Sequence, residues 1–402
     1  MIQLEKFISK YITQREISMF ASDIEANFDN LTSEIQNKSI LVIGGAGTIG
    51  SSFIKAILKF KPSSLTVVDI NENGLTELTR DLRSTNGQFI PADYITYPMN
   101  YSDPVFVKMF KNSGGFDIVA NFSAHKHVRS EKDQYSVEAL LENNVLRARN
   151  LLKLLVEFPP KHFFCVSTDK AANPVNIMGA SKKIMEDMIM SYSSEFPIST
   201  ARFANVAFSN GSLPLGFLDR IAKQQPISAP SDVTRYFVSP EESGQICMLA
   251  CVLGKTGEVY FPKLRKEQVM TFSDIATHLL IELGYSVQEC VSEQEALNLS
   301  EDLKNGSLNF PVFYSKSDTT GEKAYEEFYT NNECLDMYRY SSLGVVTNLT
   351  PRPIIEVDNL FFDLQTLFEN SNSTKEDIVI VLKKFLPNFQ HEEKGKFLDG
   401  KM

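Results

Sequence analysis

The sequence has few cysteines and no long hydrophobic run. Its five cysteines form no Cys-x-x-Cys pair and are odd in number: Cys165, Cys247, Cys251, Cys290 and Cys334. We expect reduced thiols, with Cys165 buried in a strand. Cys247 and Cys251 suit one helix face but lack other ligands, so no metal site is expected. Apolar runs such as residues 246–253 are far shorter than the roughly 20 residues that a membrane-spanning helix needs.

An excess of basic residues is also missing. The 402 residues include 40 Lys and Arg against 50 Asp and Glu, which gives a net charge of -10. This charge argues against general binding to nucleic acid or to anionic membranes, although it allows a local basic pocket for a phosphate. The N-terminal segment has no apolar core of the kind found in signal peptides. We therefore expect a cytoplasmic, soluble protein with neither a membrane nor a nucleic-acid partner.

A glycine-rich turn follows the first strongly apolar segment. Residues 39–50 read SILVIGGAGTIG, in which a β-branched run leads into Gly44, Gly47 and Gly50. Glycines allow a tight turn and a close approach of the backbone to a pyrophosphate, and the helix expected at 51–60 adds a favourable dipole. A glycine triplet alone is weak evidence. Here it has the strand before it and the helix after it that a dinucleotide site requires.

An acidic residue ends the second predicted strand. Residues 65–69 read LTVVD, and Asp69 lies about where a dinucleotide-binding fold places the carboxylate that binds ribose. A carboxylate there would repel the additional phosphate of NADP, so the sequence favours NAD. The alternative is a turn or helix-capping residue.

Strands and helices alternate along the chain. Strands are expected at 117–123, 162–167 and 198–206, and helices at 135–156 and 181–191. This alternation is typical of an α/β fold with a doubly wound, Rossmann-like parallel sheet.

Three regions follow from this pattern. Residues 1–37 have helical apolar spacing and form an N-terminal helical extension, which packs on the main domain or on a subunit partner. Residues 38–210 form an NAD-binding Rossmann domain. Prolines interrupt the pattern afterwards, so residues 211–402 are predicted to be mainly a smaller substrate-binding lobe with C-terminal helices.

Polar side chains are concentrated in residues 166–183, VSTDKAANPVNIMGASKK. Thr168, Asp169 and Lys170 directly follow an apolar strand, and Lys182 lies at the start of the next predicted helix. In open α/β sheets, ligands bind at the carboxyl ends of the strands. This stretch therefore supplies a hydroxyl, a carboxylate and two ammonium groups for a ligand site. The alternative is a solvated, charged loop.

Seven segments between residues 38 and 345 together carry a family resemblance. They are GGAGTIG at 44–50, SAHKHV at 123–128, ENNVLRARNLL at 142–152, STDKAANPVNIMGASK at 167–182, RFANVAFSNGS at 202–212, TRYFVSPEES at 234–243 and TGEKAYEEF at 320–328. The chain resembles the extended short-chain dehydrogenase/reductase superfamily. Within it, the chain is similar to the nucleotide-sugar 4,6-dehydratases of polysaccharide biosynthesis, which act on UDP-N-acetylglucosamine. The 167–182 block is specific, whereas the glycine motif alone is not.

This resemblance implies roles for residues along the chain. The NAD-binding set is Gly44, Gly47, Thr48, Ile49, Gly50, Asp69, Ser123 and Lys182, with Lys182 at the nicotinamide ribose. The substrate-binding set is His125, Lys126, Asn205, Arg235, Glu322 and Lys323. For His125 and His127 a structural role is an equal alternative, and no metal is expected. Glu322 and Lys323 could equally form a solvated turn.

The sequence departs from the superfamily pattern at Met178. This residue stands four positions before Lys182, where the superfamily usually has its active-site tyrosine. A thioether is not a useful proton donor or acceptor. The resemblance is therefore to the dehydratase branch that carries methionine there, which is associated with retention of configuration at sugar C5. Plain packing by Met178, or a protein that has lost its activity, are the alternatives.

A dehydratase mechanism can be assigned without the tyrosine. NAD would take a hydride from sugar C4 and return it at C6, which gives a 4-keto-6-deoxy sugar without net consumption of cofactor. Asp169, or a water that it orients, is the base for the C4 hydroxyl, and Thr168 can hydrogen-bond that oxygen. Asp169 is later the acid for the departing C6 hydroxyl. Lys170 is assigned the C5 proton, if burial and the charge of Lys182 lower its pKa.

Two other functions stay open. A nucleotide-sugar 4-epimerase would share the fold and the first step, but it normally needs the tyrosine and lacks the Asp-Lys pair. A non-catalytic NAD-binding sensor or scaffold would suit the loss of the tyrosine, although the retention of Asp169, Lys170 and Lys182 argues against it. Uridine is the expected base of the nucleotide, with guanosine open, and a homo-oligomer is expected from the resemblance.

Overall fold

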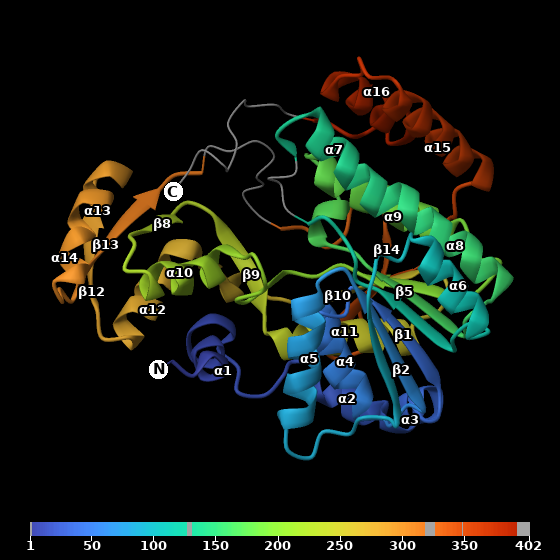
Figure 1. Cartoon of the computed structure of the whole chain (residues 1–402), viewed down its shortest axis with the longest axis horizontal. Coiled ribbons are helices and arrows are strands. Elements are labelled where there is room, and N and C mark those ends of the chain that lie inside the picture. Colours follow the sequence, from blue (N-terminus) through green and yellow to red (C-terminus); the bar gives the residue numbers. More distant parts are fainter. Residues whose placement is uncertain (1, 127–130, 318–325, 348, 392–402) are drawn as a thin grey trace.

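A nine-stranded sheet lies at the centre of the larger part of the molecule (Figure 1). The computed structural model describes residues 2–126, 131–317, 326–347 and 349–391. In these residues the strand order is β14-β15-β10-β6-β5-β4-β1-β2-β3. The strands are β1 (Ser39–Ile43), β2 (Ser64–Asp69), β3 (Asp93–Pro98), β4 (Ile118–Asn121), β5 (His162–Val166), β6 (Ile198–Ala201), β10 (Glu258–Pro262), β14 (Cys334–Asp336) and β15 (Leu343–Thr347).

The sheet is mainly parallel, as the sequence predicts. All pairings from β3 through to β10 are parallel, and β15 and β14 close one edge as antiparallel strands. The parallel strands β1, β4, β5 and β10 are fully buried apart from the first residues of β1 and β5, which is expected when helices cover both faces. The predicted doubly wound α/β fold is therefore confirmed.

Helices form a layer on each face of this sheet. One layer contains α4 (Thr48–Leu58), α5 (Glu72–Ser84) and α11 (Pro240–Leu253), whose apolar side chains share one core with the sheet. The other contains α6 (Pro104–Asn112), α7 (Gln134–Leu141), α8 (Ala148–Glu157) and α9 (Ile177–Met190). The C-terminal helices α15 (Ile354–Glu369) and α16 (Lys375–Phe385) pack outside this second layer, next to α8 and α9 (Figure 1).

A smaller part stands beside the carboxyl edge of the sheet. It contains a parallel sheet of β12 (Ser286–Cys290), β13 (Asn309–Ser315) and β8 (Ile227–Pro230). Around it lie α10 (Leu213–Ala222), α12 (Phe272–Glu282), α13 (Glu293–Leu299) and α14 (Glu301–Lys304), at the left of Figure 1. A third sheet, β11 (Val269–Thr271), β9 (Thr234–Val238) and β7 (Asn205–Val206), connects the two parts.

The segment after residue 210 contributes to both parts. It supplies the smaller part, but α11, β10, β14 and β15 return to the large sheet and its layers. Position along the chain therefore does not by itself divide the molecule into a cofactor domain and a substrate lobe.

The N-terminal segment packs on the rest of the chain. It contains α1 (Leu4–Phe7), a π-helical turn (Ile8–Thr13), α2 (Ala21–Ala26) and α3 (Phe28–Ile35). Phe7 and Ile12 join the core of the smaller part, whereas Leu31 and Ile35 join that of the larger part. Arg15 donates two hydrogen bonds to Glu242 of α11, each 2.9 Å. Of the two packing partners expected for this segment, the structure shows the chain's own domains.

None of the helices within the described residues combines the length and the apolar character that crossing a bilayer requires.

Candidate active site

The predicted site residues lie at the carboxyl edge of the large sheet. Ile43, Val68, Asn121 and Cys165 are paired across β1, β2, β4 and β5. Because these strands are parallel, the residues that follow them are brought to one edge. The glycine turn, Asp69, the 122–126 loop and the 167–170 segment all start there.

Two glycines of the turn are required by its geometry. Gly44 has a φ of 76°, and a Cβ added to it would stand 2.7 Å from the backbone nitrogen of Ser123. A Cβ on Gly50 would stand 2.3 Å from the carbonyl oxygen of Gly44. Gly47, just before α4, differs, because the atom nearest to a Cβ added there would be the carbonyl oxygen of Gly44, at 3.5 Å. A side chain at Gly47 would fill the open space in front of the helix N-terminus, where a phosphate would be favoured.

Asp69 holds the glycine turn against β2. Its carboxylate accepts hydrogen bonds from the backbone N–H groups of Ala46 (3.0 Å) and Asn71 (2.9 Å). Asn71 in turn caps α5 by accepting from Gly74. Asp69 thus has the turn role that was the alternative to ribose binding. Each carboxylate oxygen can still accept a second hydrogen bond, so the two roles are compatible.

The start of α4 is connected to the loop that follows β4. The hydroxyl of Thr48 accepts from the backbone N–H of Asn210 (2.9 Å), and the carbonyl of Asn210 accepts from the ammonium of Lys126 (2.9 Å). Ile49 packs partly buried against the core below. The structure therefore brings Thr48 of the proposed NAD-binding set next to Lys126 of the proposed substrate-binding set.

His125 is fixed by its backbone. Its N–H donates to the side chain of Asn144 (2.8 Å), and its carbonyl accepts from the same amide (2.9 Å). Desolvation by the surrounding protein, followed by the positive charge of Arg147, lowers the pKa of His125. Asn144 lies in a π-helical turn (Glu142–Arg147) between α7 and α8, a distortion often found at functional sites.

Thr168, Asp169 and Lys170 form a contiguous polar cluster. The Thr168 hydroxyl donates to Asp169 Oδ1 (2.7 Å), and Lys170 Nζ lies 3.1 Å from the same oxygen and 3.4 Å from Oδ2. Asp169 is buried at 3% exposure, whereas 29% of the Lys170 side chain is exposed. A buried carboxylate held in this way is oriented to accept a hydrogen bond from a substrate hydroxyl.

The expected protonation of Lys170 needs correction. Burial lowers the pKa of Lys170, but the negative charges of Asp169 and Glu326 together outweigh this effect. The pKa of Lys170 is therefore raised above its ordinary value. Lys182 is not the neighbour that governs it. Lys182 is itself buried, its ammonium donates to the carbonyl of Val166 (3.0 Å), and burial lowers its pKa. The lowered pKa that was expected for Lys170 is thus found at Lys182.

Met178 and Lys182 lie one turn apart on α9. The helix starts at Ile177 rather than at the predicted Ser181, because the Asn176 side chain caps it by accepting from Gly179. The carboxylate of Glu131 accepts from the N–H groups of Ile177 (3.0 Å) and Met178 (2.8 Å). Met178 is 3% exposed and packs in the core of the second helix layer.

Asn205 and Arg235 meet at a buried carboxylate that the sequence analysis did not assign. Glu326 accepts from Asn205 Nδ2 at 2.6 Å and from the backbone N–H of Tyr236 at 2.9 Å. Arg235 Nε lies 3.9 Å from Glu326 Oε1. Glu322 and Lys323, together with His127, lie outside the described residues.

Several candidate functional residues were not predicted from the sequence, because the residues that they contact are far away along the chain. Glu326 lies within the segment 320–328 that carried part of the family resemblance, but only its GEK residues received a role. Asn144 likewise lies in segment 142–152, which is part of the family resemblance. Glu131, 46 residues before Ile177, had no local signal.

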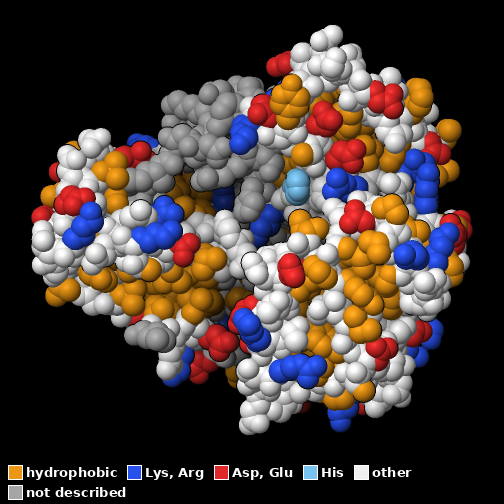
Figure 2. Space-filling model, in the orientation of Figure 1, with side chains coloured by type: hydrophobic (Ala, Val, Ile, Leu, Met, Phe, Trp, Pro, Cys, Tyr) orange, Lys and Arg blue, Asp and Glu red, His pale blue; other side chains and the backbone are white. Residues whose placement is uncertain are grey.

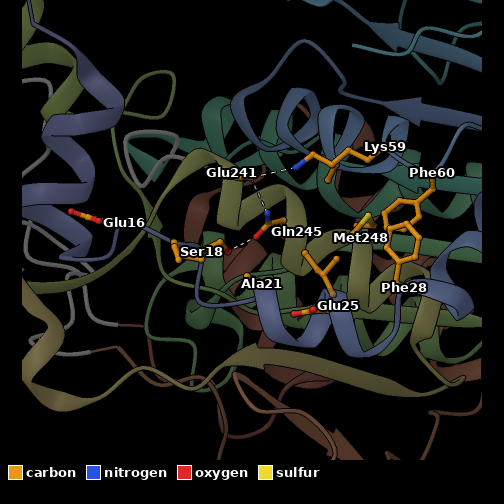
Figure 3. Close-up of a pocket in the computed structure, with 13 residues that line it drawn as sticks. Glu16, Ser18, Ala21, Glu25, Phe28, Lys59, Phe60, Glu241, Gln245 and Met248 are labelled. Atoms are coloured by element: carbon orange, nitrogen blue, oxygen red, sulfur yellow. Dashed lines mark hydrogen bonds and ion pairs between the residues drawn. The ribbon is translucent and has the colours of Figure 1, made fainter. Parts of the chain in front are cut away.

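A separate cavity of about 540 Å³ is remote from these residues (Figure 3). It lies between α2, α3, α4 and α11, and Ser18, Phe28, Lys59, Phe60 and Gln245 line it. The proposed cofactor, substrate and catalytic residues are absent from its lining. Among the described residues, no cluster of His, Cys, Asp and Glu is suited to a metal ion.

The surface between the two parts of the molecule is hollowed on the face shown in Figure 2. Lys and Arg side chains are visible in and around this hollow. Local positive charge of this kind would suit an anionic ligand despite the net charge of -10.

Comparison with known proteins identifies the family. The family described as polysaccharide biosynthesis protein matches residues 40–347. The chain belongs to this polysaccharide biosynthesis protein family. A relative of this chain is CapD, the capsular polysaccharide biosynthesis protein of Staphylococcus aureus, which is 28% identical over 310 residues. That alignment covers 76% of this chain but only 50% of CapD, so the chain spans about half the length of that relative.

Two further relatives differ in their described roles. MJ1061 of Methanocaldococcus jannaschii, described as an uncharacterized membrane protein, is 29% identical over 324 residues. The alignment covers 72% of this chain and 94% of MJ1061. The inverting UDP-N-acetylglucosamine 4,6-dehydratase of Campylobacter jejuni is 26% identical over 259 residues. The alignment covers 62% of this chain and 73% of the dehydratase.

Solved structures share the fold of this family member. Pen from Bacillus thuringiensis superimposes with a TM-score of 0.63 at 23% identity, and the match covers 83% of this chain and 99% of Pen. The UDP-N-acetylglucosamine 4-epimerase of Methanobrevibacter ruminantium gives a TM-score of 0.54 at 16% identity, covering 74% of this chain and 91% of that one. At such identities the likeness concerns the fold.

Proposed function

We propose that this polysaccharide biosynthesis protein is an NAD-dependent nucleotide-sugar 4,6-dehydratase that acts on UDP-N-acetylglucosamine. One observation carries the proposal: Thr168, Asp169 and Lys170 are joined by hydrogen bonds at the carboxyl end of β5, where a sugar would approach. A 4-epimerase has no need for an acid and a base at neighbouring carbons. The relative described as a UDP-N-acetylglucosamine 4,6-dehydratase supports the same assignment, whereas a relative described as a UDP-glucose 4-epimerase, at 28% identity, supports the epimerase as the second candidate.

The cofactor proposal rests on the glycine turn. Gly47 leaves open space before α4, and Asp69 stands at the end of β2 with acceptor capacity for ribose hydroxyls. Bound NAD would supply a reversible hydride acceptor for the sugar. The protein's contribution is to position it, and the buried ammonium of Lys182 at the end of β5 is available to the ribose.

Asp169 is assigned the first proton. Its Oδ1 is hydrogen-bonded to Thr168 and Lys170, both of which stabilise the carboxylate until the C4 hydroxyl of the sugar donates to it. Later the protonated Asp169 can donate to the departing C6 hydroxyl. One carboxyl group therefore accepts and returns the same proton.

The order of these steps would prepare Lys170 as a base. With Asp169 ionised, the pKa of Lys170 is raised, so Lys170 is an ammonium and cannot take the C5 proton. Once Asp169 has accepted the C4 proton, one of the two negative charges that raise the pKa of Lys170 is gone. Lys170, whose side chain is partly exposed, would then release its proton to solvent water more readily, at the stage when the C4 ketone makes the C5 hydrogen acidic.

Met178 bears on the stereochemistry at C5. A buried thioether in the place of the tyrosine can shape the pocket but cannot reprotonate C5. In our proposal Lys170 both removes and returns the C5 proton from the same side, which gives retention. The C5 configuration of the product, determined by NMR, tests this assignment separately from the dehydration itself.

Incubation of the protein with UDP-N-acetylglucosamine and NAD distinguishes the candidate functions. A dehydratase yields a product lighter by one water, an epimerase yields an isomer of unchanged mass, and a non-catalytic binding protein yields neither. Mass measurement of the products decides among the three, and an unchanged mass in all fractions would overturn the proposed dehydratase.

Asp69 should determine the preference between the two nicotinamide cofactors. We expect calorimetric titration of cofactor-free protein to show tighter binding of NAD than of NADP, because the carboxylate repels the additional phosphate. Asp69→Ala should reduce the difference, and Asp69→Asn provides the control that keeps the hydrogen bonds to the turn partly intact. Tighter binding of NADP by the native protein would contradict the assignment.

Arg235 should bind the diphosphate of the substrate. We expect Arg235→Ala to weaken the binding of UDP by more than one charged hydrogen bond, about 1.5–3 kcal/mol, and to leave NAD binding nearly unchanged. Arg235→Lys keeps the charge without the planar fork and should show an intermediate loss. Calorimetry of both ligands measures this, and native UDP affinity in the alanine variant would remove Arg235 from the site.

A further inference from the structure

The short segment Glu326–Phe328 connects three walls of the site. Glu327 accepts a hydrogen bond from Asn173 (3.1 Å), which follows the Asp169–Lys170 turn. The carbonyl of Phe328 accepts from the buried Arg202 (3.1 Å). Glu326, as described above, accepts from Asn205 of β7 and from the backbone of β9. The segment thus places Glu326 beside both the proposed catalytic turn and the proposed nucleotide-sugar residues.

The Glu326 carboxylate is held without freedom to turn. Its side chain is 2% exposed, and each oxygen has its own donor, Asn205 at 2.6 Å and the Tyr236 N–H at 2.9 Å. Two donors on a buried carboxylate fix its position and stabilise its charge. A glutamate serving only to fill space would not need both.

Charged groups of both signs face Glu326. They are Asp169 and Lys170 from the catalytic turn and Arg235 from β9, with the titratable Tyr236 phenol on the same strand. Burial, followed by the charge of Asp169, raises the pKa of Glu326 to about 7, while Lys170 and Arg235 oppose the rise. Glu326 therefore carries its charge above neutral pH and adds to the field at Lys170.

We propose that Glu326 is a positioning residue, which fixes Asn205 and Arg235 and places a second negative charge, besides that of Asp169, near Lys170. The inference deepens the proposed function and rests on it for the role of Lys170 as the C5 base. Without Glu326, the pKa of Lys170 would be lower before Asp169 has received a proton. The change in that pKa when Asp169 is protonated would then start from a lower value.

The protonation of Lys170 can be measured without any substrate. Acetic anhydride acetylates only the neutral amine, forming an amide and releasing acetate, and 29% of the Lys170 side chain is exposed. The rate of Lys170 acetylation as a function of pH, read by peptide mass spectrometry, therefore reports the pKa of this amine. We expect Glu326→Gln to acetylate about 3- to 10-fold faster than the native protein near pH 8, because the loss of an adjacent negative charge lowers the pKa of the amine.

Matched variants separate charge from structure. Glu326→Asp keeps the charge and should return the acetylation profile toward the native one. Glu327→Gln removes a charge at the next position, outside the carboxylate's contacts with Asn205 and β9, and should leave the profile native. A purely structural role would change the melting temperature of Glu326→Gln but would not shift the profile in this direction.

Each outcome decides the proposal. A native acetylation profile in a folded Glu326→Gln variant overturns it, as does an equal shift in Glu327→Gln. Glu326→Met serves as a second neutral variant, and if neither neutral variant folds, Glu326 is structural only and the proposal fails. A native protein that does not dehydrate UDP-N-acetylglucosamine would overturn the proposed function, whereas the acetylation profiles would still decide the charge effect of Glu326 on Lys170.

Discussion

Lys170→Met is expected to abolish formation of the dehydrated sugar while leaving its oxidation at C4 possible. Lys170 is assigned the C5 proton, and that step follows the first hydride transfer. The variant should bind NAD and the nucleotide sugar, lose about 10²- to 10⁴-fold in product formation, and accumulate reduced cofactor that is visible by its absorbance. Deuterium from the solvent should no longer enter C5.

Three further variants make this prediction specific. Lys183→Met, the same substitution at the next lysine of α9, which pairs with Asp187 at 2.7 Å, should keep nearly native turnover. Asp169→Asn should slow the first step, so that little reduced cofactor appears. Met178→Ala should lose far less than either, since the thioether only shapes the pocket. Native deuterium exchange in Lys170→Met would exclude Lys170 as the base and transfer the assignment to Lys182 or His125.

The elements of this site that could be predicted are those whose signals are local. The glycine turn requires only a strand, three glycines and a helix in sequence, and Asp69 follows its own strand. Thr168, Asp169 and Lys170 are adjacent, so their meeting at one carboxylate needs no long-range contact. A parallel sheet then brings these separate strand ends together, because each crossover returns the chain to the same edge.

The protonation of Lys170 could not be predicted in this way. The sequence predicts that Lys182, which is close to Lys170 in the chain, is the charge that acts on it. In the fold, the Lys182 ammonium donates a hydrogen bond to the carbonyl of Val166. Lys170 instead contacts Asp169 and is affected by the charge of Glu326, which lies 156 residues further along the chain. Electrostatics depends on where each charged group points, and that is decided by tertiary packing.

Some predicted ends of strands and helices were wrong for similar reasons. The predicted strand 198–206 is divided, since β6 ends at Ala201 and Arg202 leaves the strand to bind two carboxylates. The start of α9 had a local signal, because Asn176 is a preferred N-cap residue. Glu131, which accepts hydrogen bonds from the first N–H groups of α9, comes from a distant segment and could not be predicted from the local sequence pattern.

Arg202 should be the largest single contributor to stability near the site. The side chain is completely buried and donates to Glu186 at 2.8 and 2.7 Å and to Glu333 at 3.0 and 2.9 Å. Removal of one partner of a buried ion pair leaves uncompensated charge in a medium of low polarity. We expect Arg202→Met to lower the free energy of unfolding by about 3–5 kcal/mol, measured by denaturant titration.

Arg352 provides the control, because it also binds two carboxylates but is 30% exposed. It lies 3.0 Å from Asp187 and 3.1 Å from Glu356, and Arg352→Met should lower the free energy of unfolding by only about 1 kcal/mol or less. Glu186 also accepts from Ser167 (2.5 Å), directly before the proposed catalytic turn. The Arg202 variant should therefore lose the proposed dehydratase activity even at temperatures where it is folded. Equal stability losses in the two arginine variants would show that burial of the Arg202 cluster is not what makes it stabilising.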